Sequence, residues 1–110
     1  VLVTDLGYGG VVKAAQFAAR EKGAVVRTVT MPWPPSPTAA ADAIVDAVTP
    51  RTRLAIVDHI TAESALVLPL ADIAARLRAQ GVAVMADGAH APGAIAFRIE
   101  DLGVDWYVAN

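Results

Sequence analysis

The sequence predicts an open α/β fold with a three-layer αβα architecture, in which helices cover both faces of a mostly parallel sheet. Short apolar runs alternate with helix-like segments about a dozen residues long, and strands joined in this way run parallel through right-handed crossovers. The apolar runs lack polar alternation, which predicts burial on both faces. The 110 residues correspond to one small domain, residues 1–110, with no second domain.

The first half of the chain is predicted to contain two strands and two helices. In order, these are a strand over residues 1–4, a helix from Gly10 to Lys22, a strand over 25–29 and a helix from Thr38. Gly23 ends the first helix, and Thr38 can cap the second one, whose apolar residues recur at helical spacing until Pro50. The segment from Met31 to Pro37 holds four prolines, including Pro35, and is predicted to be irregular.

The second half continues the alternation of strand and helix. Its predicted elements are a strand over residues 54–57, a helix from Pro69 to Gly81, and strands over 82–86 and 105–108. Proline suits the first turn of a helix, and the apolar residues after Pro69 follow a helical period. Residues 58–64 and 89–100 are predicted to form loops.

Composition and charge narrow the function classes. With 55% hydrophobic residues, a net charge of -2 and scattered basic residues, the chain suits neither a nucleic-acid nor a membrane-surface partner. The absence of cysteine excludes a disulfide framework or thiolate site within these residues. No apolar run reaches the roughly 18 residues of a membrane helix, so we expect a soluble, cytoplasmic protein. Because both ends lie in or beside apolar runs, we expect the chain to be part of a longer protein.

The candidate site consists of residues that directly follow the predicted strands, because ligands of open parallel sheets bind beyond the carboxyl ends of the strands. These residues are Asp5 to Tyr8, Thr30 to Pro32, Asp58 to Thr61, Asp87 to His90, and Asn110. Aspartate, histidine, threonine, tyrosine and asparagine side chains would thus gather along one edge of an apolar scaffold.

Asp87 is the strongest single candidate. It follows a fully apolar strand, and a carboxylate at such a boundary needs a cation or several donors to stay ionised. A pyridinium nitrogen would supply that cation, and an aspartate that keeps the nitrogen protonated lets the ring draw electrons from a substrate. The structural alternative is that Asp87 caps a turn with Gly88.

The neighbouring candidates also have structural alternatives. His90 can donate to a ligand oxygen or to the backbone of its own loop. Tyr8 can stack on a flat ligand or simply pack at the start of the first helix. For His59 a structural hydrogen bond at the strand end is favoured.

Three other functions are compatible with parts of the pattern. The glycines around Tyr8 resemble a dinucleotide-binding loop, but Val12 stands where the third glycine would fall and no acidic residue ends the second strand. Two Asp–His sets, Asp58 with His59 and Asp87 with His90, suggest a metal-dependent hydrolase as an alternative. A non-catalytic α/β binding module is the third possibility.

Four motifs point to a family. They are Asp58-His59-Ile60-Thr61, Leu66-Val67-Leu68-Pro69, Asp87-Gly88-Ala89-His90-Ala91-Pro92-Gly93 and Asp105-Trp106-Tyr107-Val108-Ala109-Asn110. In order and spacing they resemble the large-domain core of the class V aminotransferases, pyridoxal-phosphate (PLP) enzymes of fold type I, and above all their isopenicillin N epimerase-like branch. The resemblance covers essentially the whole chain.

The resemblance implies PLP as the cofactor and a role for five residues in binding it. Asp87 would pair with the pyridine nitrogen, His90 would approach the phenolic oxygen, and Tyr8 would stack on the ring. Thr61 lies in the segment that lines the cofactor in relatives, and Asn110 corresponds to a position near the phosphate.

The resemblance also implies what these residues do not supply. The lysine that carries the cofactor would lie beyond Asn110, because Lys13 and Lys22 do not match its motif, so no catalytic residue is expected in this chain. Ala62 stands where desulfurase relatives have an asparagine. The expected protein is a homodimer that acts on an amino acid as an epimerase or racemase, an aminotransferase or a desulfurase-like enzyme.

Overall fold

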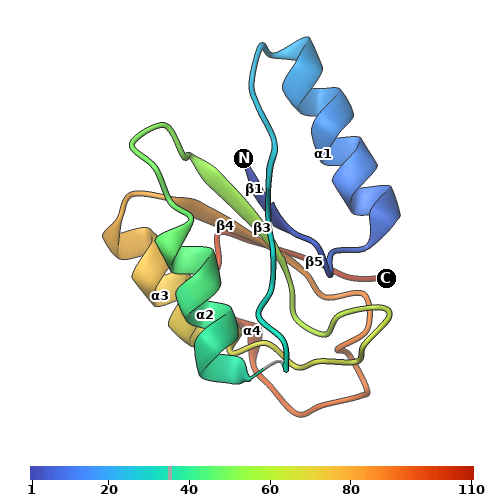
Figure 1. Ribbon diagram of the computed structural model, residues 1–110. Helices are drawn as coiled ribbons and strands as arrows, with labels where there is room; N and C mark the ends of the chain where they lie inside the picture. Colours follow the sequence, from blue (N-terminus) through green and yellow to red (C-terminus); the bar gives the residue numbers. More distant parts are fainter. Residues whose placement is uncertain (35) are drawn as a thin grey trace.

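The computed structural model describes residues 1–34 and 36–110 and contains a five-stranded parallel sheet (Figure 1). The strands are β1 (Leu2–Thr4), β2 (Arg27–Val29), β3 (Leu54–Asp58), β4 (Ala83–Asp87) and β5 (Trp106–Val108). The helices are α1 (Gly9–Glu21), α2 (Pro37–Asp46), α3 (Leu70–Ala79) and α4 (Ile99–Leu102). The strand order is β2-β1-β3-β4-β5, and these neighbours all pair in parallel, so the predicted α/β fold is confirmed. Pro35, one of the four prolines of the predicted irregular segment, lies outside the described residues.

Helices lie on both faces of the sheet, because the chain reverses its direction across the sheet after β2. The β1–β2 connection runs toward one edge, whereas the later connections run toward the other, and right-handed crossovers then place α1 opposite α2, α3 and α4. Figure 1 shows α1 standing apart from the other three helices. The largest fully buried side chains include Val3, Ile44, Val57, Leu68, Leu70, Ile73, Leu77 and Val84. The main core therefore lies between the sheet and the α2–α3 layer.

The layer on the α1 side is thin. Ala19 is the one buried residue of α1, and Phe17 is 68% exposed. Burial alternates along both central strands. Ile56 of β3 and Met85 of β4 are only half-buried, whereas the next residue of β3, Val57, and the preceding residue of β4, Val84, are buried. The predicted burial on both faces is thus complete only on the α2–α3 face, because α1 is the sole helix in the described part of the chain that covers the other face.

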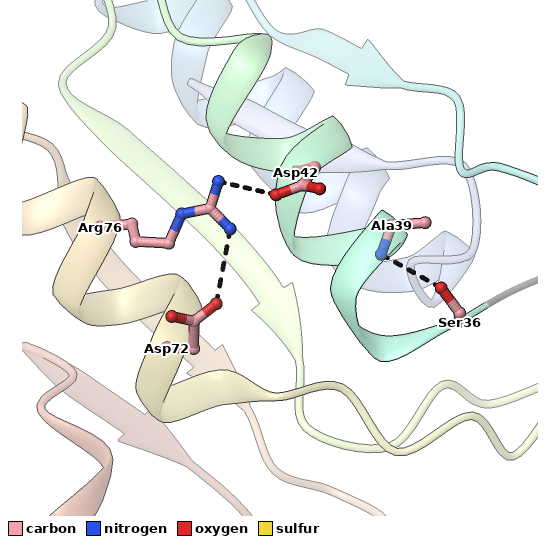
Figure 2. Close-up of polar contacts among 5 residues, drawn as sticks. All are labelled: Ser36, Ala39, Asp42, Asp72 and Arg76. Atoms are coloured by element: carbon pink, nitrogen blue, oxygen red, sulfur yellow. Dashed lines mark hydrogen bonds and ion pairs between the residues drawn. The ribbon is translucent and has the colours of Figure 1, made fainter.

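An exposed ion pair joins the two core helices on their solvent side. Arg76 Nη2 of α3 lies 2.9 Å from Asp42 Oδ1 of α2, and Arg76 Nη1 lies 3.5 Å from Asp72 Oδ2 (Figure 2). Exposed pairs of this kind contribute little to stability, because water screens their charges. The apolar contact of α2 and α3 with the sheet is therefore the main source of their stability. None of the helices in residues 1–34 and 36–110 has the length and apolar character needed to cross a membrane.

The second helix begins earlier than the sequence pattern predicts. Its cap is Ser36, not Thr38: Ser36 is extended, and the backbone N–H of Ala39 donates to its hydroxyl at 3.2 Å (Figure 2). Pro37 is then the first helical residue, a position where its fixed φ and missing N–H are tolerated. The prediction of a proline-rich irregular segment up to Pro37 was therefore wrong at its last residue.

Replacing Ser36 with alanine is expected to lower the free energy of unfolding by about 1 kcal/mol, because the first turn of α2 loses its side-chain cap. Urea denaturation of the complete protein that contains these residues measures the change. Thr38→Ala is the matched control: Thr38 lies inside the first turn, where alanine is the better helix former, so no loss is expected. Equal losses in the two variants would contradict the assignment of the cap.

The segment 89–100, predicted as loop, ends in the short helix α4. Four residues are too few for a helical period to be visible in the sequence. Gly103 ends the helix with a left-handed φ of 64°, a conformation that glycine adopts readily. This turn leads the chain into β5 beside β4.

Candidate functional site

The carboxyl ends of the strands surround a cavity of about 430 Å³. It is lined by Tyr8, Asp58, Ile60, Ala62, Asp87, Ala89, His90 and Asn110. The lining comes from the chain after β1, β3, β4 and β5, so the cavity spans the β1–β3 boundary where the connections diverge. Ligands of open α/β sheets bind at this type of switch point. Four of the five predicted cofactor-binding residues meet here, and Thr61 does not.

A cavity of similar volume, about 450 Å³, lies at the opposite end of the strands and includes three arginines. Two of these arginines are already used by the backbone. Arg27 donates to the carbonyl of Ala47 at 3.2 Å, and Arg53 donates to the carbonyl of Pro50 at 2.8 Å. These guanidinium groups thus satisfy carbonyls at and just beyond the end of α2, and we regard the carboxyl-end cavity as the functional candidate.

Asp87, the last residue of β4, points into the carboxyl-end cavity. Side chains alternate along a strand, so Asp87 shares a face with Met85, whereas buried Ala86 faces the core. The backbone N–H of Ala89 donates to Asp87 Oδ1 at 3.1 Å, which is the turn-capping bond considered from the sequence. A carboxylate accepts several hydrogen bonds, so this bond leaves Asp87 able to accept another from a ligand.

A second carboxylate lies beside Asp87. Asp58, the last residue of β3, is paired in register with Asp87 and lines the same cavity. It is only 4% exposed, and its Oδ2 atom has no hydrogen-bond partner among the described residues. Burial, followed by the negative charge of Asp87, raises the pKa of Asp58 to about 7, and a weaker backbone hydrogen bond from Tyr8 acts in the opposite direction. The sequence places both aspartates at strand ends but contains no sign of the register that pairs them.

Tyr8, His90 and Asn110 complete the polar and aromatic lining. Tyr8 lies at the start of α1 and is 59% exposed, so its ring is available to a flat ligand. His90 lies on the turn after β4, and Asn110 lies beyond β5. Both are exposed, and both reach the cavity from the side opposite Tyr8 in the strand order. Their roles in binding a cofactor stay predictions.

Thr61 has a different position from the other predicted residues. It is buried, its hydroxyl lies 2.7 Å from Ser64 Oγ, and the backbone N–H of Leu66 donates to it at 2.9 Å. Its neighbours Ile60 and Ala62 line the cavity instead. Thr61 therefore shapes the loop after β3, and a direct contact with the cofactor stays a prediction that this geometry does not favour.

His59 has a structural role in the domain and does not line the cavity. It is buried on the face opposite Asp58, and its Nδ1 atom lies 3.0 Å from the hydroxyl of Tyr107. Its ring also makes an edge contact with Phe97, with ring centroids 4.7 Å apart. Burial lowers the pKa of His59. The structural interpretation of His59 from the sequence thus agrees with its geometry.

The position of His59 argues against the metal-dependent hydrolase. That alternative needs His59 to join the two aspartates, but the side chain of His59 points away from them toward Tyr107. Within residues 1–34 and 36–110, no three histidine, aspartate or glutamate side chains gather closely enough to hold a metal ion.

The chemistry of the lining suits a cationic aromatic ring. Two carboxylates and an exposed tyrosine line the cavity, and the described lining residues include no lysine or arginine. A buried or half-buried carboxylate pair favours a cation, and a protonated ring nitrogen is both a cation and a hydrogen-bond donor. The lining therefore fits the ring of a pyridine cofactor.

The fold and this edge of the sheet define an open α/β domain with a polar cavity at the carboxyl ends of its strands. The chain belongs to the aminotransferase class-V family, whose family model matches residues 1–110. The family resemblance inferred from the four motifs is therefore confirmed.

Individual relatives support the same assignment. Isopenicillin N epimerase of Streptomyces clavuligerus is 33% identical over 111 residues, covering 100% of this chain and 28% of the relative. Putative L-cysteine desulfhydrase 1 of Oryza sativa subsp. japonica is 34% identical over 121 residues, covering 100% and 24%. A solved structure of a C-DES mutant with glycine covalently linked to its PLP cofactor has a TM-score of 0.88 at 30% identity and covers 98% of this chain and 29% of its own. The chain thus spans about a quarter of the length of these relatives.

Proposed function

We propose that residues 1–110 hold the ring of pyridoxal phosphate in an enzyme that acts on an amino acid. The observation that carries this proposal is the position of Asp87, at the carboxyl end of a central strand and facing a cavity lined by two carboxylates and an aromatic ring. The solved relative with a PLP-linked glycine, which shares this fold at 30% identity, supports the same ligand.

Four of the lining residues have distinct tasks in the proposal. Asp87 accepts a hydrogen bond from the protonated ring nitrogen and keeps it charged. Tyr8 stacks on the ring, His90 binds the phenolic oxygen, and Asn110 donates toward the phosphate. When bound, the cofactor supplies an electron sink for the bond that breaks at the substrate, and the protein selects that bond by orienting the substrate.

The substrate class follows from the cofactor and the relatives. We propose an amino acid as substrate and either epimerisation or desulfhydration as the reaction, the activities after which the two sequence relatives are named. Homodimeric assembly and a cytoplasmic location are further predictions from the family resemblance.

Titration of the complete protein with PLP, followed by visible absorption, tests the proposal. We expect one PLP per chain. Borohydride reduction followed by peptide mass spectrometry then locates the lysine that carries the cofactor, which we expect beyond Asn110. Failure of the unmodified protein to bind PLP would refute the proposed function. Stoichiometric attachment to Lys13 or Lys22 would refute the assignment of that lysine to a position outside these residues.

A further inference from the structure

The pair of aspartates at the ends of β3 and β4 raises the question of how two negative charges can share one cavity. Asp58 and Asp87 are direct partners in the parallel register, and neighbouring strands lie only about 4.8 Å apart. Both residues line the same cavity, and the described residues of that lining include no lysine or arginine. Like charges this close disfavour double ionisation, so one carboxyl group is expected to keep a proton.

The surroundings distinguish the two carboxyl groups. Asp87 is half-buried, and its Oδ1 atom accepts a hydrogen bond from the backbone N–H of Ala89 at 3.1 Å. Asp58 is 4% exposed, and its Oδ2 atom is buried with no partner among the described residues. A buried oxygen of this kind is far less costly as an O–H group with an acceptor nearby than as part of a charged carboxylate. The proton therefore belongs on Asp58.

We propose that Asp58 is a positioning residue for Asp87: it retains its carboxyl proton, donates that proton in a hydrogen bond to Asp87, and so holds Asp87 as the ionised acceptor that faces the cavity. The part of this proposal that concerns the cofactor rests on the proposed function. The ring nitrogen would then meet a single negative charge on Asp87, fixed in direction by the O–H donor of Asp58 on one side and the N–H of Ala89 on the other.

The titration behaviour of Asp58 is consistent with this arrangement. Its pKa is raised from the usual 3.8 to about 7, by burial first and by the charge of Asp87 second, against a smaller lowering by the backbone hydrogen bond from Tyr8. The titratable groups that face it are Asp87 from β4, His90 from the turn after β4, and Tyr8 from the start of α1. Because the folded state raises this pKa, the stabilisation by the Asp58 proton is fully present below pH 3.8 and is lost as the pH rises through about 7.

Infrared difference spectroscopy of the complete, cofactor-free protein tests the protonation state directly. Spectra recorded on either side of pH 7 should show the loss of a protonated carboxylic-acid band as the pH rises. The band should be absent from Asp58→Asn, an isosteric variant that has no carboxyl group, and should persist in Asp46→Asn, which alters an exposed aspartate on α2. Retention of the band in Asp58→Asn, or its absence from the unmodified protein, would overturn the proposal.

Two variants with opposite hydrogen-bonding capacity test the positioning role. Asparagine at position 58 keeps an N–H donor toward Asp87, so PLP affinity should stay within about threefold of the unmodified protein, whereas Asp58→Ala removes the donor and should weaken affinity by about tenfold or more. Equal weakening by both variants would show a merely structural role and refute the proposal. A failure of PLP binding in the unmodified protein would refute the proposed function. It would not affect the infrared result on the protonation of Asp58, because that test needs no cofactor.

Discussion

Replacement of Asp87 with alanine is expected to weaken PLP binding to the complete protein by about 30-fold to several thousand-fold, that is, by about 2–5 kcal/mol. The variant removes the acceptor that faces the cavity and leaves the ring cation without its charged partner. It leaves the core intact, because Asp87 lies on the face away from the α2–α3 layer. Equilibrium titration followed by absorption measures the effect.

Two further variants separate the charge of Asp87 from its shape. Asp87→Asn keeps the size of the side chain but loses the charge, so we expect an effect nearly as large as that of alanine. Asp46→Asn removes one exposed carboxylate from α2 and should leave affinity unchanged. Binding of PLP by Asp87→Ala with normal affinity would show that the ring nitrogen is not held at this position.

Replacement of Gly88 with alanine is expected to lower the free energy of unfolding by about 1–3 kcal/mol, the range for overpacking a filled interior. A β-carbon at position 88 would overlap the ring and hydroxyl of Tyr107. Neither side can retreat easily: the N–H of Gly88 donates to the carbonyl of Val108 at 2.7 Å, and the Tyr107 ring is backed by His59 and Phe97. Urea denaturation of the complete protein measures the loss.

Gly9→Ala is the matched control for the Gly88 variant. A β-carbon at position 9 has no neighbouring heavy atom within 4 Å, and alanine favours helix, so stability should be unchanged or slightly increased. Adding Tyr107→Ala to Gly88→Ala should cost less than the sum of the two single changes, because it removes the overlap. Additive losses would show that the ring of Tyr107 does not limit the space at Gly88.

Much of the fold could be predicted because its signals are local. Apolar runs marked β3 and β4 to within one residue, and the helical period marked α3. The cap of α2 was misplaced because serine and threonine both cap helices, and the choice between Ser36 and Thr38 depends on the path of the chain through the prolines. The short helix α4 has too few residues for a period.

The site could be predicted in part for a related reason. The rule that ligands bind at the carboxyl ends of strands leads from the sequence to Asp87, His90, Tyr8 and Asn110, which the structure brings to one cavity. The pairing of Asp58 with Asp87 depends on strand register, and the contact of His59 with Tyr107 joins residues 48 positions apart. Such long-range relations have no local signature. For the same reason the sequence did not indicate that the Thr61 side chain is buried in its own loop.

Side chains alternate between the two faces of β4, so the same strand register sets both the lining of the cavity and the packing of the core. A shift of this strand by one residue against β3 would carry Asp87 onto the face that packs in the hydrophobic core and would turn Ala86 outward. Such a slipped form would hold an unpaired carboxylate in hydrocarbon and would be strongly disfavoured. Molecules that mispair this strand are thus unstable as well as inactive, so chains that survive folding and proteolysis carry a correctly aimed aspartate.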